Sequence, residues 1–157
     1  MNSAAKVLLI GCGSLLFCAI TLFVVLIFWV ATTPEGGVKL GNEMDQYALD
    51  YIAENDLLNE SEEVLAYYDV TIRMDGTEAA MVTTDHVVYH KLGNTTSIPI
   101  IDISDINHRQ EPFIGDVIEI QAVSGESMKI EIAPMNQGES FLNVLMRKWE
   151  SLRDDAA

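Results

Sequence analysis

The chain has 157 residues and a formal net charge of −15, and all 24 of its acidic residues follow an apolar N-terminal stretch. The part after that stretch sets eight Lys and Arg residues against 24 acidic residues, a charge of −16, which argues against nucleic acid and anionic lipid as partners. Both cysteines, Cys12 and Cys18, lie inside the stretch. The acidic part therefore has no disulfide, no thiolate nucleophile and no Cys-based zinc site.

The apolar stretch runs from Val7 to Ala31, 25 residues without a charge. As a helix it would be about 37 Å long, against a hydrocarbon core of about 30 Å, so it predicts a transmembrane helix that serves as a signal anchor. A cleaved signal peptide has a shorter apolar region and a small-residue cleavage site, whereas Trp29 occupies the corresponding position here. Leu9-Ile10-Gly11-Cys12 resembles a lipoprotein cleavage box, but cleavage there would leave a long apolar segment on the product.

The charges that flank the stretch favour a cytoplasmic N-terminus. Lys6 lies before it, in the short tail of residues 1–6, whereas Lys39 follows it together with Glu35 and Glu43. The positive-inside rule therefore predicts a single-pass protein of the plasma (inner) membrane, with the acidic domain on the outer side.

Residues 32–39 form a predicted linker, because Pro and Gly interrupt a helix. The segment 40–61 is a predicted acidic helix and its connection, with Asn42 as N-cap and the helix ending near Asn55. Its apolar residues follow helical spacing at Met44, Tyr47, Ala48, Tyr51 and Ile52. This face must pack against a core, while the acidic residues form a solvated flank.

From residue 62 onward, runs of Val, Ile, Thr and Tyr are separated by turn residues at intervals of about ten, which indicates an antiparallel sheet. The predicted strands are 64–73, 78–83, 86–91, 97–103, 117–123 and 127–133. In the last two, apolar and polar residues alternate, so each strand has one buried and one solvated face. Ser140 is the predicted N-cap of a final helix, with an apolar stripe of Phe141, Val144, Leu145, Lys148, Trp149 and Leu152.

Consecutive antiparallel strands followed by one amphipathic helix resemble the pleckstrin-homology-like (PH-like) fold. The similarity is sharpest in bacterial members, at Met81–Tyr89 and at Ile98–Ile106, which is similar to the family's I-P-L-x-D-I strand. It spans about Glu62 to Leu152. The expected fold class is a transmembrane helix followed by an α+β domain: a PH-like antiparallel barrel or sandwich over residues 62–157, with a C-terminal capping helix and an extra acidic N-terminal helix.

Some eukaryotic members of this family bind lipid headgroups through basic residues around the first hairpin. The corresponding segment here, Arg73 to Glu78, has Arg73 as its one cation. The resemblance therefore implies a scaffold or interaction module and argues against phosphoinositide binding.

Two groups of residues are candidates for chemistry. His86 and His90 are four residues apart, which on a strand is about 13 Å and too far for one metal ion, so we expect ordinary surface histidines. Four further residues could form a weak divalent site or an acid–base pair, or could make turn and capping hydrogen bonds instead: Asp102, Asp105, His108 and Glu111.

No nucleophile elbow, phosphate loop or Cys/His arrangement is present in the sequence, so we expect no enzyme, no cofactor and no metal. The leading hypothesis is a membrane-anchored, non-catalytic interaction or scaffold domain that acts through a protein partner or self-association. One alternative is a small envelope hydrolase or divalent-ion-binding factor that uses Asp102, Asp105 and His108. Another is a lipid-binding domain with an apolar groove.

Overall fold

The computed structural model describes residues 20–25, 27 and 36–155, and the chain divides into two compact units, residues 1–35 and 36–157. In the first unit, residues 20–25 and 27 are helical. The rest of the predicted transmembrane helix, the lipoprotein-like box and linker residues 32–35 lie outside the described residues. Within the described part of the chain, no helix combines the length and the hydropathy that a membrane crossing requires.

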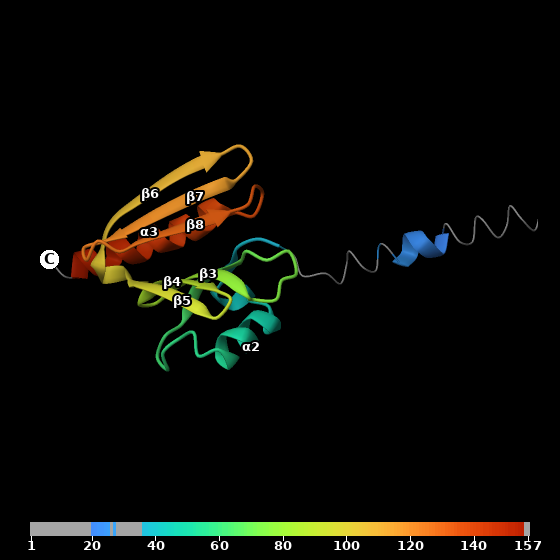
Figure 1. Cartoon of the computed structure of the whole chain (residues 1–157), viewed down its shortest axis with the longest axis horizontal. Coiled ribbons are helices and arrows are strands. Elements are labelled where there is room, and N and C mark those ends of the chain that lie inside the picture. The colour runs from blue at the N-terminus through green and yellow to red at the C-terminus, as the bar shows by residue number, and fades with distance from the viewer. Residues whose placement is uncertain (1–19, 26, 28–35, 156–157) are drawn as a thin grey trace, which may run out of the picture. The chain divides into compact units, whose positions relative to one another are not determined.

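The second unit is built on two antiparallel sheets (Figure 1). The first sheet has the order β1-β2-β3-β4-β5, with β1 at Lys39–Leu40, β2 at Val64–Asp69, β3 at Glu78–Thr83, β4 at His86–Lys91 and β5 at Asn94–Pro99. The second sheet has the order β6-β7-β8, with β6 at Ile103–Glu111, β7 at Gly115–Ala122 and β8 at Ser127–Ile132.

Four helical elements join and cover these sheets. The 3-10 turn η1 (Gly41–Glu43) and helix α2 (Gln46–Glu54) lie between β1 and β2 in the chain. A second 3-10 turn, η2 (Ile100–Asp102), leads from the first sheet into the second, and α3 (Gly138–Asp155) ends the domain.

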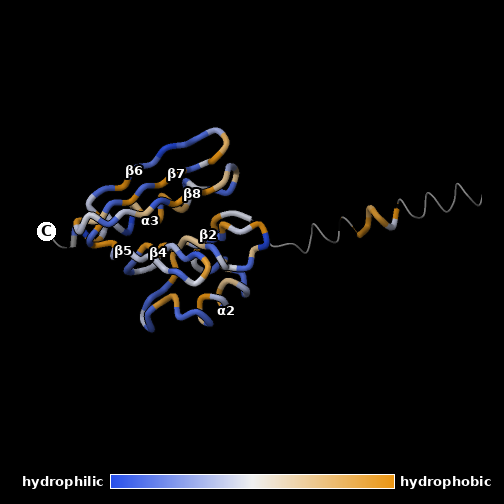
Figure 2. Tube along the Cα trace, in the orientation of Figure 1, coloured by the Kyte–Doolittle hydropathy of each residue, from blue (hydrophilic) through white to orange (hydrophobic). Residues whose placement is uncertain are grey.

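The main core lies between the two sheets and α3. Along β7 and β8, apolar residues alternate with polar ones, as Figure 2 shows, and the apolar set is buried. Phe141 and Leu145 of α3 are fully buried in the same cluster, and Trp149 donates its indole N–H to the Ile103 carbonyl at 3.0 Å. Burial of each such apolar side chain contributes about 1.5–3 kcal/mol to the stability of the folded domain, so α3 is an integral part of the core.

A second core lies on the other face of the five-stranded sheet, where α2 packs. Ala48 and Ile52 of α2 contact Tyr67, Met81 and Val88, which alternate in the strands with residues of the main core. Because both faces of the sheet are covered at β2 and β3, these two strands read as nearly continuous apolar runs, whereas β5 is polar and exposed from Asn94 to Ser97.

The sequence predictions of β3 and β4 are confirmed to the residue, and the alternation in β7 and β8 and the stripe of α3 are confirmed as well. The predicted strand 64–73 is too long, because the chain leaves the sheet after Asp69, whose carboxylate accepts hydrogen bonds from the following loop. The predicted strand 97–103 is also wrong in extent: it spans the end of β5, the turn η2 and the start of β6.

Two strands and two helix starts differ from the predictions. β6 was not predicted, and neither was β1, which spans the boundary between the predicted linker 32–39 and the predicted segment 40–61. Val38 of the linker is already buried. Helix α2 begins after Asp45 and not after the predicted N-cap Asn42, which lies in η1. Helix α3 begins at Gly138, two residues before the predicted N-cap Ser140, which is itself helical.

Candidate functional site

The predicted acid and histidine cluster does not form one site. Asp105 and His108 both lie on β6, three residues apart, and therefore point to opposite faces of the strand. His108 Nε2 lies 2.8 Å from Asp116 Oδ1, a partner that the sequence did not indicate, and Glu111 accepts a hydrogen bond from Arg109. Asp102 belongs to η2. Among the described residues, no group of three or more His, Cys, Asp or Glu side chains is placed to hold a metal ion.

The two β4 histidines have separate partners. His86 Nδ1 lies 2.8 Å from Glu62 Oε1, which also accepts a hydrogen bond from Thr83. Burial raises the pKa of Glu62, but these hydrogen bonds outweigh it and leave the pKa below its usual value. Glu62 and His86 therefore fasten the connection before β2 to the start of β4.

His90 is a buried histidine, so the expectation of a surface histidine is wrong at this position. It is 1% exposed, and its two ring nitrogens lie 3.1 Å from Tyr51 Oη and 2.9 Å from Thr95 Oγ1. Burial lowers the pKa of His90, because the charged imidazolium is poorly solvated there. The side chain links α2 to the sheet.

Asp69 is a buried carboxylate that organises the loop between β2 and β3. It accepts hydrogen bonds from Thr71 N at 2.7 Å, Thr71 Oγ1 at 2.6 Å and Gly76 N at 2.8 Å. Burial and then the charge of Asp69 raise the pKa of Tyr47 and of Tyr67, so both phenols keep their protons. With its oxygens engaged by loop donors, Asp69 has a structural role.

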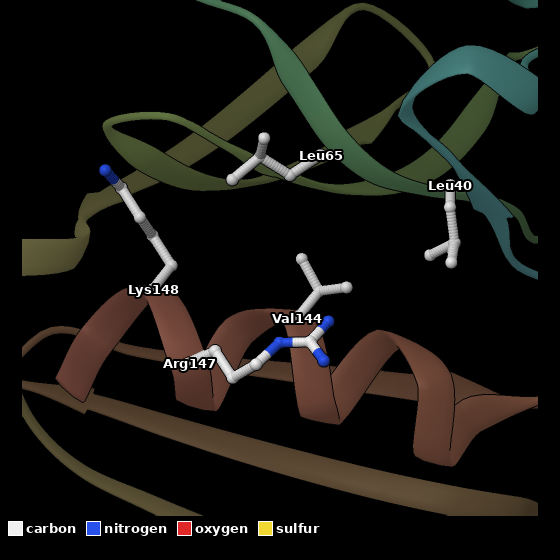
Figure 3. A pocket seen from close by; sticks show the side chains of 5 residues that line it. All are labelled: Leu40, Leu65, Val144, Arg147 and Lys148. Atoms are coloured by element: carbon white, nitrogen blue, oxygen red, sulfur yellow. The ribbon is translucent and has the colours of Figure 1, made fainter. Parts of the chain in front are cut away.

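A groove lies between strands β1 and β2 and helix α3, with a volume of about 430 Å³ (Figure 3). Its lining consists of Leu40, Leu65, Val144, Arg147 and Lys148. In Figure 3, Val144 points from the helix toward the two leucines. Arg147 extends along the helix toward Val144, while Lys148 rises from the helix to the level of Leu65. The groove thus joins an apolar surface to two cations.

The two cations of this groove are not neutralised by ion pairs within the described part of the domain. Within residues 36–155, the ion pairs of Lys and Arg side chains involve Lys39, Lys91, Arg109 and Lys129, and neither Arg147 nor Lys148 takes part in one. In an otherwise acidic domain, this leaves a local positive region beside apolar side chains, which favours an anionic, partly apolar ligand. Sequence reasoning missed the groove, because nothing local indicates that β1 lies across from α3.

Comparison with known proteins shows the fold. No family model matches the sequence, and no curated protein matches it. Among solved structures, the chain is similar to a DUF1696-family protein with a pleckstrin-homology domain from Shewanella loihica, with a TM-score of 0.52 and 10% identity over 73% of this chain and 99% of that chain. At this identity the likeness concerns the fold alone. The acidic domain therefore has a PH-like α+β fold, as the resemblance implied.

Proposed function

We propose that this chain is a membrane-anchored, non-catalytic interaction domain that binds a partner protein in the groove between β1–β2 and α3. The observation that carries the proposal is the apolar groove bordered by Arg147 and Lys148, two cations without an ion-pair partner among residues 36–155. The proposed occupant is an acidic partner segment with apolar side chains. Its apolar side chains pack on Leu40, Leu65 and Val144, and its carboxylates pair with the two cations.

The edge of the first sheet supports a peptide as the occupant. β1 is one of the two edge strands of this sheet and borders the groove through Leu40. Edge strands carry backbone groups that can pair with a further chain, so an extended segment lying in the groove can add to the sheet. A bilayer surface fits less well, because the charge of −16 after the apolar stretch repels anionic headgroups.

The distribution of titratable groups supports a non-catalytic role. Asp69 has its oxygens engaged by loop donors, His90 bridges Tyr51 and Thr95, and His108 pairs with Asp116. The Asp69 contacts hold the loop after β2, and the others join α2 to the sheet and β6 to β7. The length of the apolar stretch Val7–Ala31 supports the anchor, which would hold the groove close to partners in the same membrane.

Site-specific photo-crosslinking of the full chain in its native membrane tests the groove. A photo-reactive residue at Val144 is expected to give one discrete protein adduct, and peptide mapping is expected to place it in an acidic segment of the partner. The double substitution Arg147→Glu/Lys148→Glu should reduce the adduct at least tenfold, because it replaces two attractive charges with repulsive ones.

The matched control is Arg153→Glu, one to two turns further along α3, where the guanidinium lies over Trp149 at 4.9 Å and outside the groove lining. This variant is expected to keep the adduct. An adduct that persists after charge reversal, or one that maps to a basic segment, would refute the proposal. Adducts to lipid alone would instead support the apolar-groove lipid-binding hypothesis.

A further inference from the structure

Three loops surround the point where the chain enters the domain. A Cβ atom placed on Gly36 would lie 3.0 Å from Met74 Cε in the β2–β3 loop, and Val38 N–H donates to the Asn136 carbonyl at 3.0 Å in the turn before α3. A Cβ atom on Gly115, at the β6–β7 turn, would lie 2.7 Å from Pro134 N. Figure 1 shows these segments at the end of the domain that is remote from the C-terminus. We name Gly36 and the loops 70–77, 112–115 and 133–137 the entry face.

Each loop of the entry face exposes an apolar side chain. Ile72 is 101% exposed, Met135 97% and Phe113 96%, and these are the three most exposed large apolar side chains among residues 36–155. Ile114, beside Phe113, is 38% exposed. Single exposed apolar residues are common, but one at full exposure on each of three adjoining loops marks a contact surface.

The length of chain before Gly36 limits what can lie against this face. Residues 32–35 separate Ala31, the end of the predicted membrane helix, from Gly36. Five Cα-to-Cα steps reach at most about 18 Å, and the headgroup layer beside the hydrocarbon core is about 5–8 Å thick. With the anchor in a bilayer, Gly36 therefore has to lie close to the headgroups.

We infer that the entry face docks on the bilayer that holds the anchor, with Ile72, Phe113 and Met135 inserted into the interfacial layer. The inference rests on the proposed anchor. The contact is apolar: Arg73 is the cation of the β2–β3 loop, and Asp75 and Glu111 lie nearby in the sequence, so anionic headgroups gain little from this face. The lipid it suits is zwitterionic. Docking would fix the orientation of the domain relative to the membrane.

Depth-dependent fluorescence quenching of the full chain in phosphatidylcholine vesicles tests this inference. Because the domain has no cysteine, a Cys12→Ser/Cys18→Ser background accepts one new cysteine labelled with an environment-sensitive fluorophore. Labels at Ile72→Cys and Phe113→Cys are expected to be quenched several-fold more by lipids that carry a nitroxide near the headgroup than a label at Val123→Cys. Val123 is also exposed, at 76%, but its N–H donates to the carbonyl of Asp102 in η2, outside the entry face.

A label at Ile20→Cys, near the middle of the apolar stretch, separates the two ideas when it is read with lipids that carry the nitroxide near the end of the acyl chain. If the label at position 20 is quenched but the labels at positions 72 and 113 are quenched no more than the label at 123, the anchor is supported and the docking is refuted. Absence of quenching at position 20 would overturn the anchor itself. Stronger quenching at 72 and 113 than at 123, together with quenching at 20, supports the docked orientation.

Discussion

At the residue scale, the fold depends on polar side chains that are buried but fully partnered. His90 is held between Tyr51 of α2 and Thr95 of β5, and Tyr51 also stacks edge-on against its ring at 5.6 Å. These contacts connect the second core to the sheet edge. They also make the attachment of α2 sensitive to the protonation of one imidazole.

We expect the stability of the domain to fall as the pH drops below about 6.5. Burial lowers the pKa of folded His90 from 6.5, so the unfolded chain binds a proton at a higher pH than the folded chain does. The free energy of unfolding therefore rises with pH in the window below 6.5, by no more than about 1.4 kcal/mol per pH unit from this single group. Urea unfolding of residues 36–157 between pH 7.5 and 5 measures the slope.

The control for this prediction is His90→Gln, which removes the titration while keeping a polar side chain. The variant should be less stable at pH 7.5, because Gln replaces a fitted ring, and should show a smaller slope below pH 6.5. Glu62 does not confuse the comparison, because its lowered pKa is expected to cause a loss of stability only below about pH 4.5, its ordinary value. Equal slopes in the two proteins would contradict the role of His90.

The same residue shows where residue-level prediction ends. The two-residue period of a strand puts His86, Val88 and His90 on one face of β4. The burial of His90 depends on α2 covering this face, which follows from the long-range packing of Ala48 and Ile52 on Met81. A local pattern contains no information about which face a distant helix covers.

At the element scale, the β6–β7 hairpin is fixed by its contact with the turn that leads to α3. Gly115 has φ +96°, and a Cβ atom there would lie 2.1 Å from the Ile132 carbonyl oxygen. Gly125, in the β7–β8 turn, has a similar φ of +91° but nothing within 4 Å of its Cβ position. Substitutions at Gly125 and Gly115 therefore distinguish the cost of backbone strain alone from the cost of strain together with a steric conflict.

Gly125→Ala should therefore lower the free energy of unfolding by about 1–2 kcal/mol, the energy of a left-handed residue that has a Cβ. Gly115→Ala should lower it by about 3 kcal/mol or more, because backbone atoms of β8 must also move. Urea unfolding of residues 36–157 measures both. Equal losses at the two positions would show that the hairpin is not held against β8 as the structure indicates.

The two strands that the sequence did not predict, β1 and β6, both lack the apolar–polar alternation that marks a half-buried strand. β6 is an edge strand whose side chains are mostly exposed, and from Ser104 to Glu111 Ile106 is its one apolar residue, so it lacks the alternation that revealed β7 and β8. β1 contains two residues and is defined only by its pairing with Tyr67 and Ala66. Because Leu40 of β1 lines the groove, the candidate site could not be assembled from sequence either.

At the scale of the whole molecule, the groove and the entry face are related through α3. The helix begins at Gly138, next to the entry face, and Val144 and Lys148 lie six and ten residues along it. At a rise of 1.5 Å per residue, the groove begins about 9 Å from that end and extends to about 15 Å. If the entry face docks on the bilayer, the partner segment binds within a short distance of the headgroups. Partners with a juxtamembrane acidic segment are therefore the best candidates.

Which side of the membrane offers those partners depends on orientation, and we expect the domain on the outer side. Lys6 precedes the apolar stretch, and the positively charged flank is retained in the cytoplasm. A membrane-impermeant maleimide applied to intact cells should label Val123→Cys in the Cys12→Ser/Cys18→Ser background. Replacing Lys6 by Gln and both Thr32 and Thr33 by Lys moves the positive charge to the other flank and should reduce labelling several-fold. Labelling only after the cells are opened, in the chain with Lys6 intact, would place the groove in the cytoplasm and reverse the choice of partner.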